Sequence, residues 1–158
     1  MARWLMVCSA LSAALAVGLG AFGAHALKDQ LPRIHAAEHV ARMEANWETA
    51  ARYHLIHAVG ALLATLVLQQ CLRHESGGGA TTSPGPSPDN RSGGGEPGWW
   101  FWTPVYGLLL GPVIFSGCLY AMVLGAPRFL GAIVPIGGAL MIAGWVALAW
   151  VRFTAPKH

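Results

Sequence analysis

Four long apolar runs alternate with polar segments along this chain, and the pattern predicts four membrane-spanning helices. The runs cover approximately residues 4–25, 53–72, 100–124 and 129–151, and none of them contains Asp, Glu, Lys or Arg. Because a helix rises about 1.5 Å per residue, about 20 apolar residues cross the roughly 30 Å of hydrocarbon in a bilayer. We therefore expect an all-α membrane protein, with four transmembrane helices bundled in a single domain of residues 1–158.

The first span has a competing interpretation as a secretory signal peptide. Arg3 precedes the apolar run, and Ala24-His25-Ala26 resembles the small-residue cleavage site of such peptides. The apolar core of a signal peptide usually has about 7–15 residues, and this run is longer. The length favours a retained span that ends near Ala24, with Pro32 preventing the helix from continuing. Cleavage within residues 1–26 is the alternative.

Residues 34–52, between the first two spans, have an amphipathic pattern. One face is charged, and the other carries residues three or four positions apart that form a largely apolar stripe: Val40, Met43, Trp47, Ala50 and His54. The pattern predicts an interfacial helix that lies on the membrane surface, has Trp47 at headgroup level and continues into the second span. Glu48 precedes Arg52 by four residues, the favourable order for an interfacial ion pair.

The segment between the second and third spans has a different composition. Residues 76–98 are rich in Gly, Ser and Pro and lack apolar periodicity, which predicts a flexible loop. Trp99, Trp100 and Trp102 follow it and are typical of an aromatic belt at the boundary between water and lipid.

The overall composition also indicates lipid as the main solvent. Hydrophobic residues make up 54% of the chain and charged residues 11%, whereas soluble domains have about 25% charged residues. The formal net charge of +3 is spread along the chain without a basic stripe, which argues against a nucleic-acid partner. Cys8, Cys71 and Cys118 are isolated within apolar runs, as small buried hydrophobes are, and no disulfide is predicted.

Counting residues from the span ends places several polar side chains at one depth, on the side away from both termini. His25 ends the first span, Tyr53 and His57 enter the second, and Ser116 and Tyr120 lie within about two turns of the end of the third. Polar groups at this depth need partners. We therefore expect these five residues to form one polar layer, with His25 and His57 close to one another.

Small residues recur in the spans, and in lipid such residues mark faces where helices pack closely. We predict this role for six glycines: Gly20, Gly23, Gly117, Gly137, Gly138 and Gly144. His35 and His39 have the spacing of two metal ligands on a helix, but we interpret them as solvated side chains. No carboxylate lies in the spans to complete a zinc site with His25 and His57, and no metal site is predicted.

Four short motifs occur in order along the spans. They are G-A-F-G-A-H at 20–25, W-E-T-A-x-R-Y-x-x-x-H at 47–57, F-S-G-x-L-Y at 115–120 and P-x-G-G at 135–138, followed by Gly144-Trp145. The set resembles family 423 of the domains of unknown function, the transmembrane protein 256-like small integral membrane proteins. The resemblance covers all four spans and implies a four-helix protein, typically of the bacterial inner (plasma) membrane, with no established activity.

The chain departs from this family pattern at two places. Its Gly/Pro/Ser-rich loop is longer than that of the family. It also has additional histidines, His35, His39 and His54, for which the resemblance implies no role. Four spans place both termini on one side. The positive charges of the two sides are nearly balanced, but those on the other side lie partly on the interfacial helix and are mixed with four acidic residues, so we predict that the termini are in the cytoplasm.

The sequence favours a small structural or accessory membrane protein in which the His/Tyr layer holds helices together. Its expected partners are the lipid bilayer and either further copies of the chain or a larger membrane complex. The alternative is binding or transport of a small amphiphile (a quinone or lipid) through His25 and His57, or haem ligation by the same pair. No cofactor is predicted. The sequence contains no H-E-x-x-H, G-x-S-x-G or phosphate-loop motif, which argues against an enzyme.

Overall fold

The computed structural model describes residues 1–77 and 98–154, and every regular element within these ranges is a helix. Four helical stretches are long and apolar enough to cross a membrane, which confirms the predicted all-α membrane fold. Most of the predicted loop 76–98 lies outside the described residues. The elements in chain order are α1 (Ala2–Phe22), the π-helical turn η1 (Gly23–Leu27), α2 (Lys28–Ile34), α3 (Ala37–Gly77), η2 (Trp99–Trp102), α4 (Thr103–Val123), η3 (Arg128–Ala132) and α5 (Val134–Thr154).

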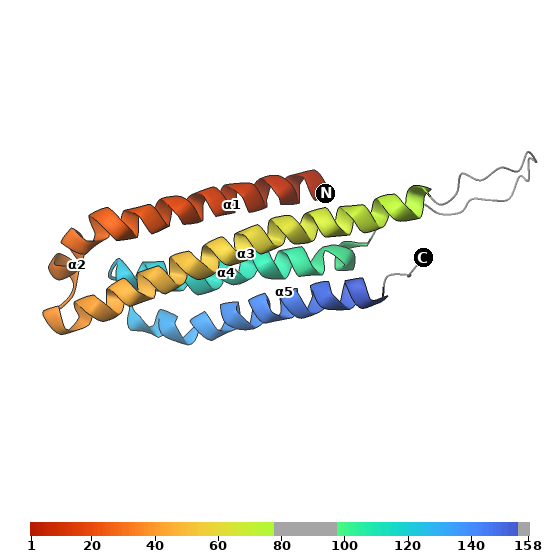
Figure 1. Ribbon diagram of the computed structural model, residues 1–158. Helices are drawn as coiled ribbons and strands as arrows, with labels where there is room; N and C mark the ends of the chain where they lie inside the picture. The colour runs from red at the N-terminus through yellow and green to blue at the C-terminus, as the bar shows by residue number, and fades with distance from the viewer. Residues whose placement is uncertain (78–97, 155–158) are drawn as a thin grey trace, which may run out of the picture.

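The four long helices form a row in which each packs against the next. α1 lies against α3, α3 against α4, and α4 against α5, so α1 and α5 occupy the two edges (Figure 1). α1 begins at the same end of the row at which α5 ends, as an even number of spans predicts (Figure 1). The opposite end, called the distal end below, holds η1, α2, the start of α3 and the turn between α4 and η3.

The sequence predicted that the first helix ends near Ala24, and the structure shows that it does not. It continues through η1 and α2 to Ile34, and the chain becomes extended at His35 (φ −126°, ψ 149°). Pro32 lies in the last turn of α2, where the hydrogen bond that its ring removes would soon be lost in any case. Leu27 and Leu31 favour the longer helix, because their spacing of four puts both side chains on one fully buried face.

α3 joins the predicted interfacial helix and the second span in one continuous helix. It begins at Ala37, and its 41 residues extend about 60 Å, roughly twice the thickness of the hydrocarbon. The predicted apolar face turns towards the neighbouring helices, where Met43, Trp47 and Ala50 are buried. That residues 34–52 lie on the membrane surface stays a prediction.

Glycines allow α4 and α5 to approach each other closely. A Cβ atom on Gly107 would lie 2.9 Å from the Cα of Gly144, and one on Gly111 would lie 3.0 Å from the carbonyl oxygen of Gly137. Any larger residue would therefore force the two helices apart. Gly107 and Gly111 form a G-x-x-x-G pair, which was absent from the predicted set although this spacing is a known signal for helix contact.

Candidate functional site

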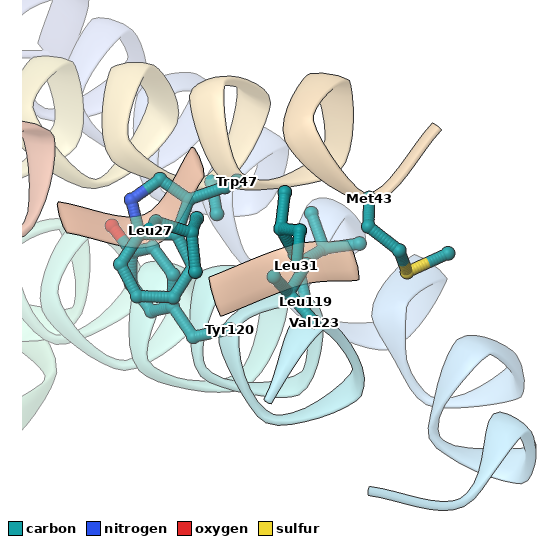
Figure 2. Packing of buried hydrophobic residues seen from close by; sticks show 8 residues of the cluster. Leu27, Leu31, Met43, Trp47, Leu119, Tyr120 and Val123 are labelled. Carbon is teal, nitrogen blue, oxygen red and sulfur yellow. The ribbon is translucent and has the colours of Figure 1, made fainter. Parts of the chain in front are cut away.

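Trp47 of α3 lies in the buried cluster at the distal end (Figure 2). It is 2% exposed, and its indole Nε1–H donates a hydrogen bond to the carbonyl oxygen of Leu19 in α1, with an N···O distance of 2.8 Å. Its ring centroid is 5.4 Å from that of Phe22 in α1 and 4.6 Å from that of Tyr120 in α4. Trp47 therefore joins three helices. The bundle itself offers both apolar partners and an acceptor for the indole N–H, and the predicted headgroup level of Trp47 stays a prediction.

Gly23 makes room for this indole ring. A Cβ atom at position 23 would collide with Cδ1 and Nε1 of Trp47. Gly23 is also the first residue of the π-helical turn η1, a kind of turn at which helices often bend. The motifs at 20–25 and 47–57 therefore contribute the two halves of one contact.

Three residues of the predicted layer contribute to contacts of α3. The buried Ser116 hydroxyl donates a hydrogen bond to the carbonyl oxygen of Ala50 (2.8 Å), which links α4 to α3. The buried His57 donates from Nδ1 to the carbonyl oxygen of Tyr53 one turn earlier (2.8 Å). The His57 ring also stacks on Tyr53 at 5.8 Å and meets the edge of Trp145 in α5 at 6.2 Å. Each of these polar groups has a protein partner.

A second histidine, His54, occupies the space between α1, α3 and α4. A hydrogen bond of 3.0 Å joins His54 Nε2 to Ser12 Oγ of α1, and the His54 ring centroid lies 6.3 Å from that of Tyr120. His54 is 7% exposed and Tyr120 is 9% exposed. Neither His54 Nδ1 nor the Tyr120 hydroxyl has a hydrogen-bond partner among the described residues. Two neighbouring rings thus carry buried polar atoms with unused hydrogen-bonding capacity.

His25 does not join the other four residues of the predicted layer. Its side chain is exposed on η1, and no hydrogen bond or ring contact within the described ranges connects it to them. The buried positions of this turn are Gly23 and Leu27, so position 25 faces the other way. No hydrogen bond or ring contact of the described residues joins His25 to His57, so their proximity stays a prediction.

The six glycines that were predicted to pack helices divide into three groups. Gly23, Gly137 and Gly144 are buried, and a Cβ atom on each would approach a neighbouring helix at 3.0 Å or less. A Cβ atom on Gly138 would make only an ordinary contact with Phe115 at 4.0 Å. On Gly20 or Gly117 it would meet no atom within 4 Å, so these two positions do not set a helix spacing.

The charged face of α3 forms an ion pair that differs from the predicted one. Glu44 Oε1 lies 2.8 Å from Lys28 Nζ of α2. Glu48 and Arg52 are exposed and form no ion pair in the part of the chain that the structure describes. The extension of the first helix into α2 is what brings Lys28 within reach of α3.

No metal centre is formed by the histidines of the distal end. Within residues 1–77 and 98–154, no three His, Cys, Asp or Glu side chains gather as metal ligands do. His35 instead donates from Nε2 to the carbonyl oxygen of Val123 (2.8 Å), which ties the α2–α3 connection to the end of α4.

Comparison with known proteins gives one family and several bacterial relatives. Residues 19–138 match the family described as "Protein of unknown function (DUF423)". A UPF0382 membrane protein of Staphylococcus epidermidis (strain ATCC 12228) is 35% identical over 143 residues, which cover 90% of this chain and 89% of that protein. The UPF0382 membrane protein YwdK of Bacillus subtilis is 31% identical over 143 residues, covering 90% of each chain.

A further relative, from Escherichia coli, is named as an inner membrane protein. The UPF0382 inner membrane protein YgdD of Escherichia coli (strain K12) is 26% identical over 147 residues, covering 92% of this chain and 86% of that protein. No solved structure matches the chain. The family match includes Gly23, Trp47, Ser116 and Tyr120, so the contacts at the distal end lie within the shared region. The chain belongs to the DUF423 family and is an integral membrane protein of that family.

Proposed function

We propose that the chain is a small accessory membrane protein, which acts by contact with other membrane components and catalyses no reaction. The observation that carries this proposal is the use of polar groups at the distal end. Trp47, Ser116 and His54 each form a hydrogen bond with a neighbouring helix. Such bonds stabilise helix contacts in membranes by about 1 kcal/mol each, which is an architectural role.

The edges of the helix row support contact with a partner. α1 packs mainly against α3 and α5 mainly against α4, and their outer faces expose large apolar side chains, among them Leu11, Leu15, Ile142 and Val146. Lipid covers such faces in an isolated chain, and a second copy or another membrane protein could replace it. The edge helices are therefore the surfaces on which we propose that partners bind.

The test is to purify the full chain in a mild detergent and to measure its absorption spectrum and native mass. An accessory protein is expected to show no Soret band and no stoichiometric quinone, and to assemble with itself or with a defined membrane protein. A haem spectrum, or one quinone per chain, would contradict the proposal. His54→Asn should lower the unfolding temperature, whereas the exposed His25→Asn should leave it unchanged.

A second candidate function is binding of a small amphiphile, and the unpartnered atoms His54 Nδ1 and Tyr120 Oη favour it. A quinone carbonyl would accept a hydrogen bond from the Tyr120 hydroxyl, a role that the sequence had assigned to His25 and His57. Under this function, a short-chain quinone raises the unfolding temperature of the wild type but not that of Tyr120→Phe. If no quinone changes the wild-type temperature, this candidate is excluded. Tyr120→Phe should then be neutral or stabilising, because it removes a buried hydroxyl that has no partner.

A further inference from the structure

A cavity of about 480 Å³ opens at the distal end, separate from the His54–Tyr120 pair. Its walls are the end of α2, the first turns of α3 and the turn between α4 and η3. The basic residues His39, Arg42 and Arg128 line it, and no Asp or Glu does.

The two arginines of this cavity have no acidic partner among the described residues. The ion pair formed nearby joins Glu44 to Lys28 of α2, so this carboxylate is already engaged. Two guanidinium groups without ion pairs, from α3 and η3, therefore border one cavity. Guanidinium groups present several donors in a planar fork that matches a phosphate group.

The turn after α4 holds Arg128 in this wall. Gly125 has a positive φ of 99°, which favours glycine, and a Cβ atom there would lie 3.4 Å from Ile34. The hydrogen bond from His35 to the carbonyl oxygen of Val123 fixes the same turn to the α2–α3 connection. The cavity is thus built by contacts between segments that are distant in sequence.

The remaining wall is apolar, with Ile34, Met43 and Met122 among its residues. Figure 2 shows Met43 at the outer margin of the buried cluster. By length and composition, the third candidate span ends at Val123 and the fourth begins at Arg128, so we expect the cavity beside this turn at the headgroup level of a bilayer. Its basic and apolar walls are complementary to an amphiphile with an anionic headgroup.

We propose that this cavity binds the phosphate-bearing headgroup of an anionic membrane lipid. Arg42 and Arg128 contact the phosphate, and the apolar wall accepts the beginning of the acyl chains. Basic pockets between transmembrane helices are a known mode of headgroup recognition. This site is independent of the accessory function, because neither arginine takes part in the contacts that join the helices.

The test uses native mass spectrometry of the full chain in detergent, with phosphatidylglycerol or phosphatidylcholine of identical acyl chains added. We expect one phosphatidylglycerol to be retained per chain in preference to phosphatidylcholine. Arg42→Gln combined with Arg128→Gln should weaken this retention roughly 20-fold, since two cations near the headgroup are lost. The matched control is Arg3→Gln with Arg73→Gln, which removes two exposed arginines at the opposite end and should retain the lipid as the wild type does.

Three results would overturn the proposal. Equal retention of the two lipids would show that the headgroup charge is not recognised. Equal loss in the two double variants would show that only the total charge matters. If excess inorganic phosphate displaces the lipid, or alone protects the wild type but not the Arg42/Arg128 variant from thermal unfolding, the ligand is free phosphate. Because both arginines are exposed, an unchanged unfolding temperature without lipid verifies that the variant is folded.

Discussion

Trp47 shows how strongly one side chain can constrain the residues around it. Its indole ring needs an acceptor for Nε1–H, which the Leu19 carbonyl provides, and it needs a flat surface, which Gly23 provides. Removing this ring would leave a cavity between α1, α3 and α4, and cavities of this size in a packed interior cost several kcal/mol. Two motifs that look unrelated in sequence therefore depend on each other.

The first prediction compares two glycines of the same motif. Gly23→Ala introduces a methyl group that collides with Trp47 and should cost about 1–3 kcal/mol of unfolding free energy. Gly20→Ala, three residues earlier, meets no atom within 4 Å and should change the free energy by less than about 0.5 kcal/mol. Unfolding of both variants by SDS titration measures the difference. Equal effects would mean that helix propensity, not the Trp47 contact, decides the outcome.

At the scale of elements, α4 and α5 illustrate a contact that depends on backbone proximity. Their glycines lie opposite each other, Gly107 facing Gly144 and Gly111 facing Gly137. Close backbones increase van der Waals contact, which is the main attraction between helices when lipid is as apolar as the side chains. The exposed glycine of the same helix, Gly117, contributes nothing to this contact.

The second prediction tests this contact with a larger side chain. Gly107→Leu should separate α4 from α5 and cost at least about 1–3 kcal/mol of unfolding free energy. Gly117→Leu adds the same side chain to the exposed face of the same helix and should have little effect. A thermal unfolding series in detergent compares the two variants. Loss of stability in Gly117→Leu alone would place the α4 contact face on the other side of the helix.

The elements were predictable from the sequence to a greater extent than the site. Run length and the lack of charge identify spans, because every backbone polar group must be satisfied within the helix in lipid. Depth is also predictable from the rise per residue, but depth says nothing about direction around the helix. His25 has the expected place in the sequence and the wrong direction, because the π-helical turn that precedes α2 buries Gly23 and Leu27 instead.

The predicted face of the helix at 34–52 contained both Trp47 and His54, but it was expected to face the membrane surface. In the structure Met43, Trp47, Ala50 and His54 of this face are buried against the neighbouring helices. Because the opposite face is charged, the amphipathic pattern was explained by a helix on the membrane surface, and packing against other helices was not considered. The Lys28–Glu44 pair was not predictable, since it depends on a first helix that continues past its apolar run.

At the scale of the whole molecule, the proposed partner surface and the proposed lipid site lie on different parts of the row of helices. The beginning of α1 and the end of α5 share one end of the row (Figure 1). The opposite end carries the polar contacts and the basic cavity. A partner at the edge helices and a lipid at the distal end would therefore not compete for the same surface.

The third prediction concerns orientation. Fusions of green fluorescent protein to either terminus should fluoresce in bacterial cells, and alkaline phosphatase fusions at the C-terminus should be inactive, because both termini are expected in the cytoplasm. An active C-terminal phosphatase fusion, together with two fluorescent-protein fusions that do not fluoresce, would reverse the orientation. Termini on opposite sides would contradict the four-span fold.

The central claim is that the motifs at 20–25 and 47–57 form a single contact through Gly23 and Trp47. A double-mutant cycle tests it most directly, with Gly23→Ala, Trp47→Ala and the combined variant compared by unfolding free energy in detergent. Removing the indole ring removes the collision, so Gly23→Ala should cost little in the Trp47→Ala background, with a coupling energy of at least about 1 kcal/mol. Additive effects within about 0.5 kcal/mol would show that the two residues do not touch and would contradict the account.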